Sequence, residues 1–132
     1  MQTEAAWFAK LRDCGPMTAN TMNHHIAYYG ELLSTVLFGE LVRMSCSIFD
    51  NVKVGIETNT DEILALGEWV YVGYTEVDES LVEIIIAGFF EAYLQIGDRH
   101  PELTKMFGER FSGIILQWCA EHNLHFYDPD SE

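Results

Sequence analysis

Histidine side chains are the first candidates for chemistry, because imidazole can bind a metal ion or transfer a proton near neutral pH. One group is the adjacent pair His24 and His25, and a second group lies near the C-terminus with cysteine and aspartate neighbours: Cys119, His122, His125 and Asp128. Zinc sites usually have four ligands at recognised spacings, and neither group reproduces one. We therefore expect no bound metal, and we predict that these histidines cap helices or lie partly buried.

Carboxylate pairs are the second candidates, because two of them can share acid–base work. Glu31 and Glu40 are nine residues apart, which is about two and a half turns and places the side chains apart around a helix axis. The chain also has no glycine-rich phosphate loop, no GxSxG turn and no HExxH zinc motif. We therefore predict a protein that is not an enzyme, with no catalytic residues and no cofactor.

Acidic residues are concentrated in one part of the chain. Between Lys53 and Arg99 there is no Lys or Arg, whereas the segments on either side are close to charge balance. This base-free window holds ten acids: Glu57, Asp61, Glu62, Glu68, Glu76, Asp78, Glu79, Glu83, Glu91 and Asp98. The excess negative charge is therefore local, and a local field can attract a complementary partner.

Two interpretations of these acids remain open. Several fall in first helical turns, where the helix dipole favours carboxylates on an ordinary solvated face. Glu79 and Glu83, however, are spaced i, i+4 with like charge, which is mildly destabilising and has no such explanation. We predict a partner-binding surface in which Tyr71 and Tyr74 are aromatic anchors if the helix exposes them, with core packing as the alternative role for at least one of the two. Its residues are Asp61, Glu62, Glu68, Tyr71, Tyr74, Glu76, Asp78, Glu79 and Glu83.

The composition limits the possible partners. The chain has 132 residues, 21 acids against 7 Lys and Arg, and a formal net charge of -14. Nucleic-acid binding is not expected, because phosphate contacts need clustered Lys and Arg. Hydrophobic residues make up 48% of the chain, which is enough to build a core and too much for a disordered acidic tail. We expect one folded domain over residues 1–132 that binds a basic protein.

The location is expected to be cytoplasmic. No secretory signal is recognisable near the N-terminus. The longest uncharged apolar run, 84–90, is much shorter than the roughly 20 residues that span a bilayer, so we expect no membrane contact. The three cysteines are an odd number without CxxC spacing, which predicts buried, inert thiols.

The elements that would position these residues are helices, because apolar residues recur at helical spacing almost throughout. We predict helices over 4–14, 25–49, 60–73, 78–97 and 108–122, a loop over 50–59 and a short turn after Pro101. Residues 127–132 are expected to form a frayed acidic tail. The fold prediction is all-α, a single domain built as an irregular bundle of five to six helices.

One stretch that begins in the predicted helix over 60–73 is ambiguous in type. Residues 69–74 (WVYVGY) are rich in β-branched and aromatic side chains, which suit a strand. We predict a helix, because no second run of comparable quality could pair with such a strand.

The order of the segments resembles a group of small acidic bacterial proteins. The resemblance covers about residues 28–115 and rests on four segments: GELLSTVLFGELVR (30–43), EILALGEW (62–69), DESLVEIIIAGFFEAYL (78–94) and ELTKMFGERF (102–111). Some members of that group are immunity proteins of polymorphic toxin and contact-dependent growth-inhibition systems. The resemblance implies a helical protein, encoded beside a toxin, that blocks the toxin by tight binding and has no catalytic residues.

Charge and resemblance predict the same class of function. We expect a non-catalytic immunity or inhibitor protein that neutralises a basic partner, a cognate bacterial toxin (nuclease) domain, through its acidic surface. One alternative is a mimic of nucleic-acid charge that blocks a defence enzyme. Another is a helical small-molecule-binding or enzyme domain, which a pocket with convergent polar groups would favour.

Overall fold

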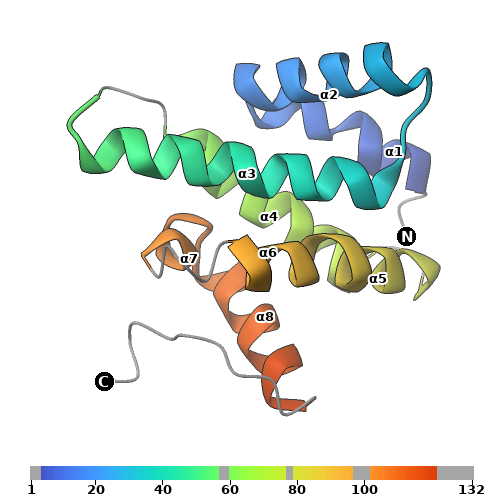
Figure 1. Ribbon diagram of the computed structural model, residues 1–132. Coiled ribbons are helices and arrows are strands. Elements are labelled where there is room, and N and C mark those ends of the chain that lie inside the picture. The colour runs from blue at the N-terminus through green and yellow to red at the C-terminus, as the bar shows by residue number, and fades with distance from the viewer. Residues whose placement is uncertain (1–3, 57–59, 77–78, 97–101, 122–132) are drawn as a thin grey trace.

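The computed structural model describes residues 4–56, 60–76, 79–96 and 102–121, and within these ranges it has helices and no strand (Figure 1). The helices are α1 (Glu4–Ala9), a 3-10 turn (Leu11–Cys14), α2 (Pro16–Tyr29), α3 (Ser34–Lys53), α4 (Asp61–Glu76), α5 (Glu79–Ile85), a π-helical segment (Ile86–Phe90), α6 (Glu91–Ile96), α7 (Leu103–Met106) and α8 (Glu109–Glu121). The all-α class predicted from the sequence is confirmed.

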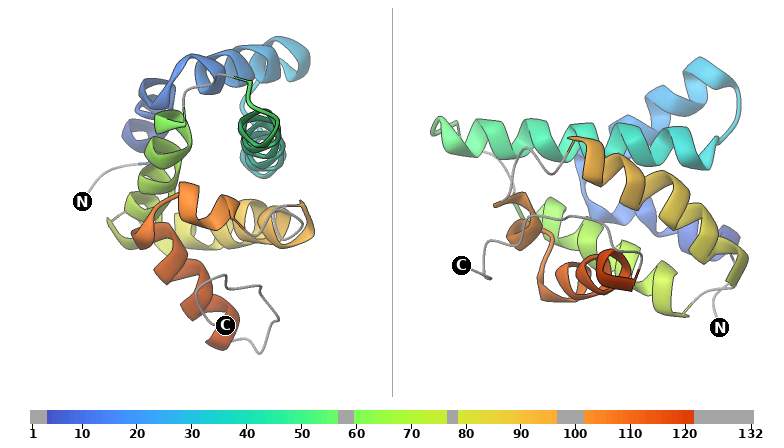
Figure 2. Two further views of the ribbon diagram at one scale, coloured as in Figure 1. Left: turned by 90° about the vertical axis from the view of Figure 1, so that its left-hand side faces the viewer. Right: turned by 60° about the horizontal axis from the view of Figure 1, so that its bottom comes forward.

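Helix α3 lies in the middle of the arrangement. Helices α1 and α2 are on one side of it, and the α5–π–α6 segment is on the other side (Figures 1 and 2). Helix α4 packs against α5 and α8, and α8 points away from α3. The apolar core between these helices is rich in aromatic rings and includes Leu37, Phe38, Leu41, Ile48, Ile63, Leu66, Val70, Ile85, Phe89, Phe90, Tyr93, Phe107, Phe111 and Ile115.

The predicted helix over 25–49 is wrong in its bounds, because Gly30 divides it. Gly30 has a φ of 77°, a left-handed conformation that favours glycine, and its N–H donates to the Ile26 carbonyl at 2.8 Å. Helix α2 therefore ends at Tyr29, and α3 continues to Lys53, beyond the predicted start of a loop. The other end of α2 is marked by Pro16 at the first helical position, where its missing N–H costs nothing.

The predicted helix over 78–97 is interrupted by the π-helical segment Ile86–Phe90. This segment packs against α3 at Gly88. A Cβ atom at Gly88 would lie 2.5 Å from Cδ2 of Phe38 and 3.1 Å from Cα of Thr35, so only glycine permits this approach. The stretch 69–74 belongs to α4, which confirms the prediction that it is helical.

A pair of tryptophans joins α1 to α4. The rings of Trp7 and Trp69 stack with centroids 3.7 Å apart. Each indole N–H donates to the other residue's carbonyl, at 2.9 Å from Trp7 and 2.8 Å from Trp69. Both side chains are buried, and Gly73 makes room for Trp7, since a Cβ atom there would lie 2.3 Å from Cζ2. The pair therefore satisfies its own buried polar groups while it holds two distant segments together.

Two further predictions are limited by the described ranges. None of the described helices is both long and apolar enough to cross a membrane. The predicted tail at 127–132 and the residues Asp78, His122 and His125 lie outside the described residues.

Candidate functional site

The predicted acidic surface divides into exposed and buried residues. Asp61, Glu76 and Glu83 are exposed. Glu76 and Glu83 form no ion pair with any side chain that the structure describes. Asp78 and the side chain of Glu79 lie outside the described part of the chain.

Glu62 belongs to the fold and not to a binding surface. Its side chain is buried, and its carboxylate accepts hydrogen bonds from the backbone N–H groups of Met17, at 3.3 Å, and Thr18. These groups belong to the first turn of α2, where N–H groups lack partners within the helix and the dipole favours a negative charge. Gly15 permits this contact, since a Cβ atom there would lie 2.3 Å from Cδ of Glu62. The prediction that Glu62 contacts a partner is therefore wrong.

Arg110 of α8 occupies part of the predicted surface. Its guanidinium lies 3.4 Å from the carboxylate of Glu68 and 5.5 Å from the ring centre of Tyr71. A basic side chain from outside the base-free window therefore lies beside Glu68 in the folded chain. Glu68 and Tyr71 are half-buried under this contact, and they are less available to a partner than their sequence positions predict.

Tyr74 has a packing role. Its ring lies 5.4 Å from the ring of Phe90, centroid to centroid, and the side chain is half-buried. Burial raises the pKa of its hydroxyl, and the nearby Glu121 carboxylate raises it further. Tyr74 therefore remains neutral and serves the helix contact, not an exposed anchor.

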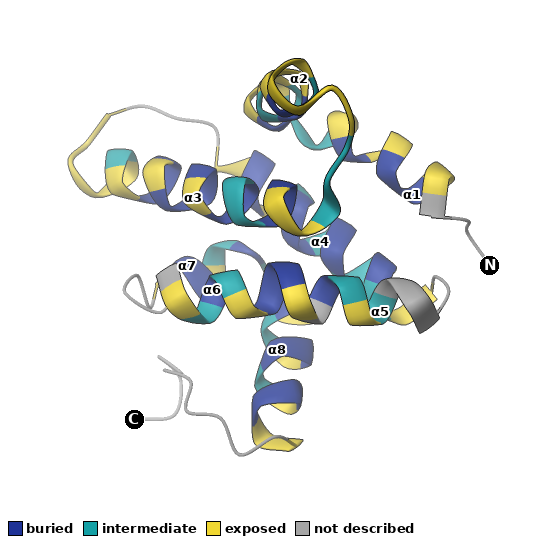
Figure 3. Ribbon diagram, turned by 45° about the vertical axis from the view of Figure 1, so that its right-hand side comes forward, coloured by how far each residue is buried: buried dark blue, intermediate teal, exposed yellow. Residues whose placement is uncertain are grey.

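The solvent side of α5 and α6 carries acids that are free to meet a partner. Glu83, Ala87, Glu91 and Gln95 are exposed, whereas the opposite side of the same segment is buried against α3 and α8 (Figure 3). The four residues follow one another at intervals of four, and none of them is basic. Glu91 forms no ion pair among the described side chains. We call Glu83 and Glu91 the acidic face.

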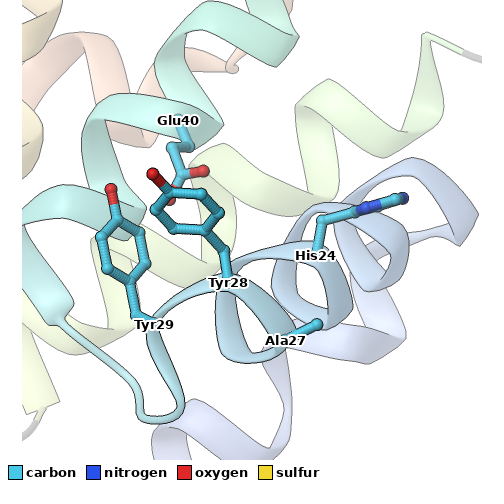
Figure 4. Close-up of a pocket in the computed structure, with 5 residues that line it drawn as sticks. All are labelled: His24, Ala27, Tyr28, Tyr29 and Glu40. Carbon is cyan, nitrogen blue, oxygen red and sulfur yellow. The ribbon is translucent and has the colours of Figure 1, made fainter.

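A second candidate site is a groove between α2 and α3. A hollow of about 560 Å³ is lined by His24, Ala27, Tyr28, Tyr29 and Glu40 (Figure 4). It continues into a hollow of about 430 Å³ that shares His24 and Glu40 and adds residues of both helices: Met17, Asn20, Thr21, Arg43, Met44 and Ser47. We call the first hollow the tyrosine groove.

A histidine and a glutamate join the two helices beneath this groove. His25 is buried, its Nδ1 atom is hydrogen-bonded to Oε1 of Glu40, and its Nε2 atom accepts the Leu33 N–H at 2.9 Å. Because Nε2 accepts, the proton of the neutral ring lies on Nδ1 and is donated to the carboxylate. Both nitrogens are therefore occupied, and His25 has no free nitrogen for a substrate or a metal ion.

Two of the three cysteine thiols that the structure describes, those of Cys14 and Cys46, are poorly reactive. Burial, with the Glu62 and Asp13 carboxylates, raises the pKa of Cys14 to about 12. Burial, with Asp50, raises the pKa of Cys46 to about 11. Since the thiolate is the nucleophile, both thiols stay protonated near neutral pH. Among the described residues, no three His, Cys, Asp or Glu side chains gather as a metal site would require.

Comparisons with models of known protein families, with curated proteins and with solved structures find no match. The function must therefore be argued from the geometry of these two sites.

The sequence does not predict the tyrosine groove, although two of the residues that line it, His24 and Glu40, are candidates for chemistry. Nothing in the local pattern of the adjacent pair His24 and His25, or of Glu31 and Glu40, places Glu40 beside α2. The sequence feature that indicates this arrangement is Gly30, because glycine often marks the end of a helix. A turn at Gly30 folds α3 back on α2 and brings Glu40 to His25.

Proposed function

We propose that this chain is a non-catalytic protein that binds a basic protein partner through the acidic face of α5 and α6. The observation that carries the proposal is the state of Glu83 and Glu91. Both are exposed, and neither forms an ion pair with a described side chain. Their charge is therefore available to a partner, in contrast to that of Glu62 and Glu68.

The electrostatics favour binding of a basic partner. A formal net charge of -14 on a chain of 132 residues destabilises the compact state through self-repulsion. Such a charge raises the rate of association with a positively charged surface above a neutral baseline of about 10⁵ to 10⁶ M⁻¹s⁻¹ at low salt. An acidic face whose carboxylates form no ion pair with the described side chains is therefore suited to rapid capture of a basic protein.

In its finer form, we propose an immunity or inhibitor role against a bacterial toxin domain. A nuclease toxin presents a basic cleft to its substrate, and an acidic protein can occupy that cleft by complementary charge. The resemblance of the sequence to immunity-type proteins supports this choice, and it requires no catalytic residue on this chain.

A neutralisation assay tests this role. The product of each adjacent gene is expressed in a bacterial host with this chain, and survival is compared with that of cells lacking it. Wild-type protein should restore growth against one of these products, and Glu83→Lys/Glu91→Lys should not. The matched control is Glu102→Lys/Glu109→Lys, which makes the same change in net charge on exposed residues of the α7–α8 region.

Two results would contradict the proposal in different ways. Full protection by Glu83→Lys/Glu91→Lys would show that the acidic face is not the binding surface. Growth arrest by an adjacent gene product that binds wild-type chain but is not neutralised would exclude the inhibitor role.

A further inference from the structure

The tyrosine groove carries an exposed aromatic side chain that packing does not explain. Tyr28 is 83% exposed, the highest value among the large hydrophobic side chains that the structure describes. Tyr29 beside it is 41% exposed. Tyrosines in such positions contribute little to the stability of the fold, and they are enriched among the residues that dominate protein interfaces.

The two tyrosine rings are held in a defined arrangement. Their centroids are 4.8 Å apart and their planes make an angle of 78°. Tyr29 in turn lies 4.8 Å from the buried ring of His25, centroid to centroid. Figure 4 shows both tyrosines directed from the end of α2 toward Glu40 on α3, whereas His24 points away from them. One wall of the groove is therefore aromatic, and a carboxylate lies beside it.

The carboxylate of Glu40 keeps a free oxygen for a ligand. Oε1 accepts the His25 proton, whereas Oε2 has no hydrogen bond from any residue that the structure describes. The side chain is 27% exposed, so solvent and ligands can reach it. Because His25 is neutral in this hydrogen-bond arrangement, it does not cancel the negative charge of Glu40.

The basic residue nearest to this carboxylate along α3 does not close the groove. Arg43 lines the neighbouring hollow, which shares Glu40 and His24, but it is not among the residues that line the tyrosine groove. Arg43 is exposed, and no ion pair joins it to the Glu40 carboxylate. A cation is therefore repelled from the Arg43 end and favoured at the tyrosine end.

Aromatic faces beside a carboxylate are the chemistry that recognises a cationic group. A guanidinium or ammonium is attracted by the ring face of tyrosine, and it forms a charge-assisted hydrogen bond with a carboxylate oxygen. We propose that the tyrosine groove binds an arginine or lysine side chain of the basic partner. This inference rests on the proposed function and adds a second contact surface, on the α2–α3 side of the molecule.

The shape of the groove favours a side chain presented by a protein over a free small molecule. Small-molecule sites usually enclose most of their ligand. Here four of the five lining residues are themselves exposed, namely His24, Ala27, Tyr28 and Tyr29. Such an open groove suits a cation that a larger interface already holds in place.

The test uses blocked amino acids as probes of the isolated contact. N-acetyl-arginine amide, N-acetyl-lysine amide and the neutral isostere N-acetyl-citrulline amide are titrated into the ¹⁵N-labelled full chain, and amide chemical shifts are followed by NMR. The arginine or lysine probe should produce saturable shifts at Tyr28, Tyr29 and Glu40, and the citrulline probe should not.

Variants assign the shifts to the two parts of the groove. Tyr28→Ala should weaken binding of the cationic probe by about fivefold, which corresponds to one exposed cation–π contact, whereas Tyr28→Phe should retain it. Glu40→Gln keeps an oxygen acceptor for His25 but removes the charge, and it should weaken binding by a similar factor. Glu109→Gln removes an exposed charge elsewhere on the molecule and should leave binding unchanged.

The outcomes separate this inference from the proposed function. Saturable shifts confined to α5 and α6 would overturn the groove as a cation site and leave the acidic face as the binding surface. Equal shifts from the citrulline and arginine probes would also overturn it, because the charge would then play no part. A third outcome combines two measurements: the cationic probes shift the groove amides, and the partner still binds Glu83→Lys/Glu91→Lys at full affinity. That outcome would support the groove and contradict the acidic face.

Discussion

The corner between α1, α2 and α4 and the corner between α2 and α3 both join helices through polar side chains. At the first corner, Trp7, Trp69 and Glu62 are buried, and they make hydrogen bonds to backbone groups of distant segments. At the second corner, His25 is buried, but its partner Glu40 reaches solvent beside the exposed Tyr28. The carboxylate of Glu62 is thus used entirely within the fold, whereas the carboxylate of Glu40 also faces the tyrosine groove.

The type of residue therefore does not reveal its role. Glu62 and Glu40 are both glutamates that hold a neighbouring helix. Only Glu40 has an exposed fraction and a free oxygen, and only Glu40 can therefore serve the fold and a ligand together. Substitutions of corresponding residues should therefore act strongly at one corner and weakly at the other.

The largest difference is expected between the two glutamates. Glu62→Ala removes the acceptor from two N–H groups at the start of α2, one part-buried and one buried, and it should lower the free energy of unfolding by about 3 kcal/mol. Glu40→Ala should cost about 1 kcal/mol, because water can enter the groove and solvate His25. Chemical denaturation of the two variants measures both values. Equal losses would mean that the corners do not differ as described.

A smaller effect is expected from filling the space beside the tryptophan pair. Gly73→Ala places a methyl group against Trp7 and should cost about 2 kcal/mol through overpacking. The control is Gly113→Ala, on an exposed turn of α8 with nothing within 4 Å of the new atom. That control should stabilise the helix by about 0.5 to 1 kcal/mol. A Gly73→Ala variant as stable as the wild type would contradict the tight packing at this corner.

A pH effect should also distinguish the buried corner. The pKa of Cys14 is raised to about 12 from 9.0, so the folded state holds the thiol proton more tightly than the unfolded state. This contribution to stability is fully present below pH 9.0 and is lost as the pH rises from 9.0 toward 12. Wild-type protein should therefore lose more unfolding free energy over this pH interval than Cys14→Ala. An identical decline in both proteins would exclude Cys14 as a source.

At the corner between α2 and α3, loss of the exposed aromatic side chain should hardly change the stability of the fold. Tyr28→Ala should alter the free energy of unfolding by no more than about 0.5 kcal/mol, since the side chain is almost fully exposed. Thermal melts of wild type and variant check this value. A large loss would mean that Tyr28 supports the α2–α3 contact and is not available to a ligand.

The helical class was predictable from apolar spacing, because the stripes along α3, α4 and α8 are regular. The division at Gly30 was missed because the apolar pattern continues on both sides of it, so only the glycine itself marks the end of α2. The sequence also does not predict the π-helical segment, which lies where Gly88 packs closely against Phe38 of α3.

The candidate sites were predictable only in part. The concentration of acids indicated an acidic surface, but sequence could not separate Glu62, which is buried against α2, from Glu83, which is exposed on α5. The contact of Arg110 with Glu68 joins segments far apart in the chain, and no local pattern reveals it. Tertiary packing determines whether each carboxylate of the base-free window is buried or exposed, and the sequence alone does not show this.

The salt dependence of partner binding is the direct test of whether the acidic face binds a basic protein. The affinity of the neutralised partner is measured over a salt series for wild-type protein, Glu83→Lys/Glu91→Lys and the control Glu102→Lys/Glu109→Lys. We expect the acidic-face variant to bind at least about tenfold more weakly at low salt, with a shallower salt slope, while the control stays close to wild type. Wild-type affinity and an unchanged slope in the acidic-face variant would contradict this expectation.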